Sequence, residues 1–114
     1  MLDARRCCGS ASRNQSSAAT INEYPALTSK GITIKYKITR GTLDRTGEFI
    51  ISASTTAVGF DDTFTESGAD VGVTLTAVLD DKDSTSGNET VAFKFTTTST
   101  GTAATIDYQT TILA

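Results

Sequence analysis

The chain has 114 residues, a formal net charge of −3 at pH 7, 22 Thr and 11 Ser, and neither His nor Trp. That length suits one small domain, and the lack of His removes the commonest general base and the imidazole metal ligands. No run of the sequence approaches the roughly 18 apolar residues of a membrane-spanning helix. The many Thr favour β-structure, because β-branched side chains suit a pleated surface. We therefore expect an all-β domain whose function does not rest on His chemistry.

The first 28 residues are rich in Ser, Ala, Arg and Asn and hold too little apolar surface to order alone. One interpretation is a disordered tail; the other is an extended docking arm that becomes ordered against a neighbouring subunit. The arm hypothesis assigns partner binding to two basic and three apolar residues: Arg5, Arg6, Ile21, Tyr24 and Leu27. The sequence thus predicts two parts, an arm over residues 1–28 and a folded domain over residues 29–114.

Two cysteines, Cys7 and Cys8, are adjacent within this arm, and a disulfide between neighbouring residues is geometrically strained. They are interpreted as two free thiols or as a link to another chain. The segment from Ser10 to Gln15 is polar where a secretory signal would be apolar. The expectation is therefore a protein that folds in the cytoplasm or leaves the cell as part of something larger.

Charge is unevenly distributed along the chain. Residues 1–30 hold four basic and two acidic residues, a net charge of +2, whereas residues 31–114 hold six basic and eleven acidic residues, a net charge of −5. Proteins that bind nucleic acid need a basic face. The acidic body therefore argues against nucleic acid as a partner.

From residue 31 onward, apolar and polar residues alternate with a period of two, which is the pattern of a half-buried strand. The clearest example places Ile32, Ile34, Tyr36 and Ile38 on one face. The pattern predicts six strands, at residues 32–39, 49–53, 58–64, 71–79, 91–95 and 105–112, with an Asp pair interrupting the third. The predicted fold is an antiparallel β-sandwich of about six to eight strands, of jelly-roll or immunoglobulin-like type.

The connection over residues 80–89 is polar and rich in carboxylates, which calcium prefers as ligands. Asp81 and Asp83 fit the first and third positions of an EF-hand loop, but the glycine falls at position seven instead of six and position twelve is Ala92. The segment is therefore interpreted as a hydrated hairpin loop. A weak calcium site at Asp81 and Asp83 is the alternative, and no cofactor is expected.

Asp61, Asp62 and Glu66 are candidates for the paired carboxyl groups of glycoside hydrolysis. Adjacent residues of a strand point to opposite faces, so Asp61 and Asp62 cannot act together on one substrate. The serines have no Gly-x-Ser-x-Gly context and no His to activate them. The sequence therefore predicts that the protein is not an enzyme and has no catalytic residues.

Strand and turn residues make up three segments, SKGITIKY at 29–36, DVGVTLTA at 70–77 and VAFKFTTTSTGT at 91–102. They resemble strands of small β-sandwich structural domains in the virions of tailed bacteriophages, which form capsid decorations and tail or fibre appendages. The resemblance covers about residues 29–113 and carries no functional residues across. It implies a virion structural protein, assembled in the host cytoplasm, that forms a homo-oligomer such as a trimer and contacts capsid or tail subunits. Neither nucleic acid nor membrane is an expected partner.

An alternative function is a carbohydrate- or surface-binding sandwich module that uses the polar segments 61–70 and 80–89. Such modules usually present Trp or Tyr platforms, and this chain has no Trp. Tyr36 and Tyr108 alternate in phase with Ile residues, which indicates packing in the core or an interface instead.

Overall fold

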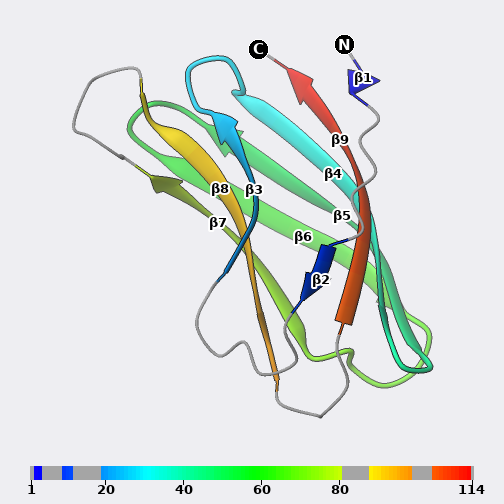
Figure 1. Ribbon diagram of the computed structural model, residues 1–114. Coiled ribbons are helices and arrows are strands. Elements are labelled where there is room, and N and C mark those ends of the chain that lie inside the picture. The colour runs from blue at the N-terminus through cyan, green and yellow to red at the C-terminus, as the bar shows by residue number, and fades with distance from the viewer. Residues whose placement is uncertain (1, 4–8, 12–18, 81–87, 99–103, 114) are drawn as a thin grey trace.

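The computed structural model describes residues 2–3, 9–11, 19–80, 88–98 and 104–113. Within these residues all regular structure is β-strand, and two antiparallel sheets pack face to face (Figure 1). This confirms the predicted all-β antiparallel sandwich. The strands are β1 (Leu2–Asp3), β2 (Gly9–Ala11), β3 (Ala19–Pro25), β4 (Gly31–Arg40), β5 (Leu43–Ala53), β6 (Val58–Glu66), β7 (Val73–Asp80), β8 (Thr90–Thr97) and β9 (Ala104–Leu113).

The larger sheet, sheet A, has the order β9-β4-β5-β6, and the short β1 and β2 both pair with the outer side of β9. Sheet B has the order β3-β8-β7. The chain crosses between the sheets after β2, after β3, after β6 and after β8. Strands β6 and β7 therefore end their respective sheets and are joined directly by residues 67–72 (Figure 1).

The core lies between the sheets and follows the predicted alternation most closely in β4. Ile32, Ile34, Tyr36 and Ile38 are all buried, and the positions between them are exposed or half-buried. Across the core, Phe49 of β5 packs its ring 5.2 Å from that of Phe93 in β8. A period of two thus places the apolar face of each strand against the other sheet.

Two strands are longer than the apolar pattern predicts. β5 begins at Leu43 instead of Phe49, because the inward positions between these two residues are Arg45 and Gly47, which carry no apolar signal. β6 runs without a break through Asp61 and Asp62, which lie on opposite faces as expected of adjacent strand residues. The interruption predicted at this Asp pair is therefore wrong.

The sandwich includes residues before 29, because β1 and β2 pair with β9 of sheet A and β3 belongs to sheet B. Residues Ala19–Pro25 form β3, which pairs with β8, and Tyr24 is only 6% exposed. The hydroxyl of Tyr24 is hydrogen-bonded to that of Thr110 at 3.0 Å, which joins the two sheets. The register of β3 shifts between Thr20 and Asn22, and such a bulge breaks the period of two that reveals other strands. The part of the predicted arm from residue 19 onward thus belongs to the folded domain.

Candidate functional site

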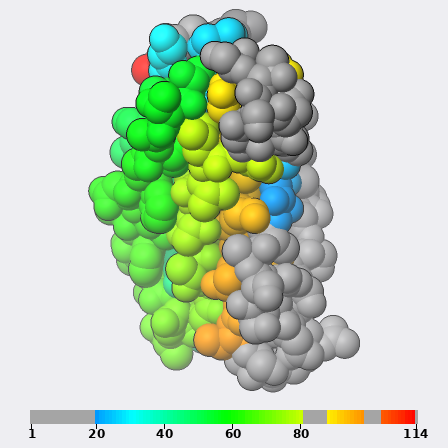
Figure 2. Space-filling model, turned by 90° about the vertical axis from the view of Figure 1, so that its left-hand side faces the viewer, coloured from blue at the N-terminus to red at the C-terminus, as the bar shows by residue number. Residues whose placement is uncertain are grey.

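The side of the sandwich where the two sheets end is open. A groove of about 600 Å³ lies there, which we call the β6–β7 groove. Figure 2 views this side, with β6 in green beside β7 in yellow-green. The groove is lined by Arg45, Asp62, Phe64, Asp70, Gly72, Val73, Thr74, Leu75, Thr96, Thr97 and Thr98.

One wall of the groove is the edge of β6. Along this strand, residues whose main-chain groups bond to β5 alternate with residues whose main-chain groups point away from the sheet. The amide of Ser67 donates to the carbonyl of Asp44 at 3.0 Å, and the amide of Ser54 donates to the carbonyl of Ala57 at 2.9 Å. Hydrogen-bonded pairs alternate along an antiparallel ladder, so in the register of β5 and β6 the odd-numbered β6 residues bond to β5. The N–H and C=O groups of the even-numbered residues, from Val58 to Glu66, therefore point away from the sheet. Within the described residues β6 pairs with no strand but β5.

The same even-numbered residues of β6 direct their side chains toward the inner face. Phe60 stacks on the core residue Phe49 with ring centroids 5.2 Å apart, yet it stays 47% exposed. Phe64 is 44% exposed. Asp62 lies between them in the strand. The edge thus combines free main-chain groups with an apolar–acidic–apolar row of side chains.

The opposite wall is the edge of β7, where the amide of Thr98 donates to the carbonyl of Gly72 at 2.8 Å. By the same alternation the main chain of Val73 and Leu75 faces the groove. The carbonyl of Val73 accepts a hydrogen bond of 2.8 Å from Arg45 Nη1. One free main-chain acceptor of β7 is therefore capped by a side chain of the other sheet.

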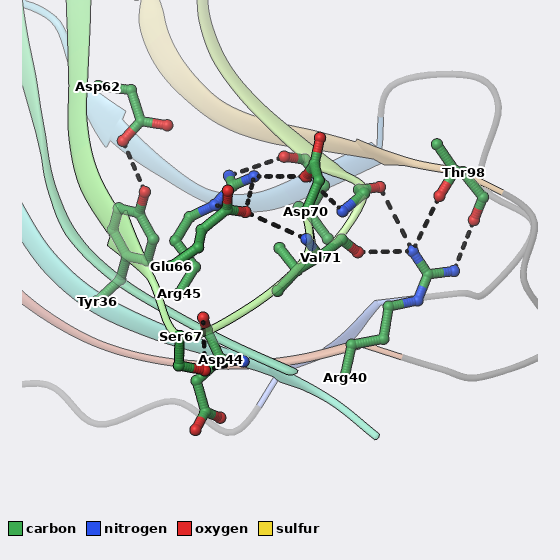
Figure 3. Close-up of polar contacts among 12 residues, drawn as sticks. Tyr36, Arg40, Asp44, Arg45, Asp62, Glu66, Ser67, Asp70, Val71 and Thr98 are labelled. Carbon is green, nitrogen blue, oxygen red and sulfur yellow. Dashed lines mark hydrogen bonds and ion pairs between the residues drawn. The ribbon is translucent and has the colours of Figure 1, made fainter. Parts of the chain in front are cut away.

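Arg45 is the centre of the polar cluster in Figure 3. Its Nε and Nη2 each lie 3.2 Å from Glu66 Oε2, and its Nη2 lies 3.3 Å from Asp70 Oδ1. The guanidinium carbon sits 4.0 Å from the centroid of the Phe64 ring. Glu66 Oε2 also accepts a hydrogen bond from the amide of Val71 at 3.1 Å. The buried Arg45 thus fixes both ends of the connection from β6 to β7.

A second buried arginine, Arg40, holds the same connection from the other side (Figure 3). Its Nη1 donates to the carbonyl of Val71 at 2.9 Å, and its Nη2 donates to the carbonyl of Thr98 at 2.6 Å. Gly72 has a positive φ of 72° and lies against Thr98 and Arg40. The sequence predicted a connection where both arginines lie and did not identify them as buried residues. Both nevertheless follow the inward alternation of their strands, Arg40 together with Ile38 in β4 and Arg45 together with Phe49 in β5.

Tyr36 and Asp62 are joined across β5 by a short hydrogen bond. The hydroxyl of Tyr36 donates to Asp62 Oδ1 at 2.6 Å (Figure 3). Gly47 lies opposite Tyr36 in β5, and a Cβ there would come within 2.7 Å of the Tyr36 hydroxyl, the Phe64 Cβ and a main-chain carbonyl of β6. Burial and the hydrogen bond to Asp62 raise the pKa of Tyr36. Burial also raises the pKa of Asp62, and the hydrogen bond and the charge of Arg45 oppose that rise.

The Gly47→Ala variant is expected to lose about 1–3 kcal/mol of unfolding free energy, because overpacking a tight site forces strain on its neighbours. The added methyl group clashes with the path by which Tyr36 reaches Asp62. Urea denaturation measures the loss. Gly59→Ala is the matched control, since a Cβ at Gly59 meets nothing within 4 Å. Equal stabilities of the two variants would contradict this account of Gly47.

The raised pKa of Asp62 predicts that the difference in unfolding free energy between the Asp62→Asn variant and the original protein depends on pH. The folded protein holds the Asp62 proton to higher pH than the unfolded chain, whose Asp pKa is about 3.9. The stability contributed by that proton is present below about pH 4 and is lost as the pH rises through the folded pKa. The Asp62→Asn variant lacks this loss, so its unfolding free energy minus that of the original protein should grow from about pH 4 to pH 7. Urea denaturation across this range measures it, and a flat or shrinking difference would contradict the raised pKa.

The structure brings few of the sequence-predicted site residues together. Asp62 and Glu66 lie in or beside the groove, whereas Asp61 lies on the outer face of β6. Tyr24 is buried in the core, Ile21 packs partly buried against it, and Leu27 is 55% exposed between β3 and β4. Arg5, Arg6, Cys7, Cys8, Asp81 and Asp83 lie outside the described residues.

The described residues contain no group of three or more His, Cys, Asp and Glu side chains placed to hold a metal ion. In the same part of the chain, no helix is long and apolar enough to cross a membrane. The groove brings together the edges of β6 and β7, the exposed Phe64 ring and the carboxylates of Asp62 and Asp70. Comparisons with protein-family models, with characterised proteins and with solved structures found no match to the chain.

Proposed function

We propose that the protein is a non-catalytic structural subunit of a bacteriophage virion, which assembles through its β-sandwich and is attached to the capsid or tail by its N-terminal arm. The observation that carries the proposal is the open edge of β6, where Phe60 and Phe64 are exposed beside outward-facing main-chain groups. A sheet edge of this kind favours association with another chain. In an assembled particle a neighbouring subunit would cover it.

The arm of this proposal is taken as residues 1–18, because β3 is part of the sandwich. Its short strands β1 and β2 pair with β9 of the same chain. Arg5 and Arg6 are its proposed basic contacts. Leu27, 55% exposed at the start of the β3–β4 connection, is an apolar contact that the folded domain can offer. Tyr24 fills the core of its own chain and stabilises the domain instead.

Immunogold labelling of virus particles, purified from a culture that produces the protein, tests the proposal. We expect label on the head or the tail, and we expect a variant lacking residues 1–18 to fold but to be absent from particles. Size-exclusion chromatography with light scattering should show an oligomer of the full chain. A stable monomer that no particle contains would overturn the proposal.

A second candidate, a carbohydrate-binding module, is favoured by one observation. The β6–β7 groove combines the exposed Phe64 ring with the hydroxyls of Thr74 and Thr96 and the carboxylate of Asp70, which is 75% exposed. A glycan array with and without calcium tests it. Specific binding that is lost in Phe64→Ala and kept in Ile50→Ala, an exposed residue outside the groove, would favour this module over the virion subunit.

A further inference from the structure

We propose that the free edge of β6 binds an extended segment of a partner protein as an added strand, and that this segment carries a basic residue flanked at two positions on each side by apolar residues. The inference deepens the proposed function and rests on it, because it states the chemistry of the partner that covers the assembly surface.

The main chain of β6 offers outward-pointing hydrogen-bonding groups to which a further strand can pair. Phe60, Asp62 and Phe64 point their N–H and C=O groups away from β5, as the hydrogen-bond alternation requires. Strands that add to a sheet edge gain affinity from such main-chain groups and specificity from alternate side chains. The three residues offer three donors and three acceptors in a row.

The side chains of the same three residues define what the added strand must carry. Residues directly opposite in an antiparallel pair have Cβ atoms roughly 4.5–5.5 Å apart, and opposite charges or apolar pairs there are favourable. Phe60 and Phe64 therefore select apolar partners, and Asp62 between them selects a basic one. The β6–β7 groove, with a volume of about 600 Å³, is lined by Asp62 and Phe64 and offers space for the side chains opposite these two residues.

Charge distinguishes a basic partner from a second copy of β6. Residues 58–72 contain four carboxylates and neither Lys nor Arg. Arg45 neutralises Glu66 and Asp70 by ion pairing, which leaves Asp61 and Asp62 along the edge. Two copies of β6 paired antiparallel about Asp62 would set one Asp62 carboxylate directly opposite the other, which is unfavourable. A basic segment brings the opposite charge and is therefore the favoured occupant.

The experiment uses the full chain and three synthetic peptides with blocked ends. The first peptide is Thr-Val-Thr-Arg-Thr-Val-Thr, and the second has Glu in place of Arg. The third is the first with N-methyl groups on the amides of both Val residues and of Arg, the residues that would lie opposite Phe60, Asp62 and Phe64. Binding is measured by NMR titration, and amide hydrogen exchange is measured at residues 60–64. We expect the Arg peptide to bind about tenfold more tightly than the Glu peptide, and the N-methylated peptide to lose binding.

Hydrogen exchange locates the bound strand. With the Arg peptide, the amides of Phe60, Asp62 and Phe64 should slow by about tenfold or more, whereas those of Asp61 and Thr63 already bond to β5 and should change little. In Asp62→Asn, the preference for Arg over Glu should fall to less than about threefold. Equal binding of the two peptides, or protection at other amides, would overturn the inference.

Two further outcomes separate the possible occupants. Protection of the same three amides without peptide, rising with protein concentration, would show that a second copy covers the edge and would overturn the basic partner. Particles that carry the protein, combined with no peptide binding, would overturn strand addition and leave the proposed function standing. Peptide binding without labelled particles would overturn the proposed function and leave strand addition standing.

Discussion

Replacing Arg45 by Ala is expected to lower the free energy of unfolding by about 3–5 kcal/mol, because removing one partner of a buried ion pair leaves the other charge uncompensated. The side chain of Arg45 is 5% exposed and that of its partner Glu66 is 19% exposed. The substitution also removes the donor to the carbonyl of Val73 and the cation over the Phe64 ring. Urea denaturation followed by circular dichroism measures the loss.

Two companion variants separate the parts of this effect. Arg45→Lys keeps the positive charge but loses the planar fork that spans Glu66 and Val73, so it should be intermediate in stability. Combining Arg45→Ala with Glu66→Gln should recover part of the loss, since coupled residues show interaction energies of about 0.5–3 kcal/mol. Thr46→Ala, at the exposed neighbouring position, is the control. A loss in Arg45→Ala no larger than in Thr46→Ala would contradict the assigned role.

The second large effect is expected at Phe49. Phe49→Ala should lose about 3–5 kcal/mol of unfolding free energy, because it deletes a fully buried ring and leaves a cavity. That ring lies 5.2 Å from Phe93 in sheet B and 5.2 Å from Phe60 on β6. The variant should therefore loosen the packing between sheets as well as the support of the β6 edge.

Thermal and urea unfolding of Phe49→Ala measure this loss. Ile50→Ala is the matched control, because the next residue of the same strand lies on the outer face and is 42% exposed. Its expected loss is much smaller, since most of its apolar surface is already in water. Comparable losses in the two variants would contradict the assignment of Phe49 to the centre of the core.

The side chains of Phe60, Asp62 and Phe64 on β6 are each held in place by a residue of the sandwich. Phe60 packs one face on Phe49 and leaves much of its surface open, and Phe64 is held under Arg45. Asp62 is held by Tyr36, whose path across β5 requires Gly47. The side chains that would meet a partner are thus fixed from within the sandwich, which reduces the conformational entropy lost on binding.

The sequence alone predicts the strands whose apolar residues keep a strict period of two. In β4 the inward residues Ile32 to Ile38 are all buried, and burial on one face is what a period of two encodes. It could not reveal β3, because a bulge between Thr20 and Asn22 shifts the register and the apolar residues Ile21 and Tyr24 fall three apart. It also missed the start of β5, where Arg45 and Gly47 occupy inward positions without apolar character.

The contacts of the polar residues in those strands depend on the tertiary structure. Asp62 and Tyr36 are 26 residues apart and meet because β4, β5 and β6 lie side by side. Arg45 bonds to a carbonyl 28 residues away, because β6 and β7 end adjacent sheets. Local alternation records which face of a strand is buried, but it holds no information about which strand stands opposite. That pairing, set by long-range packing of the whole chain, is what creates the groove and its open edge.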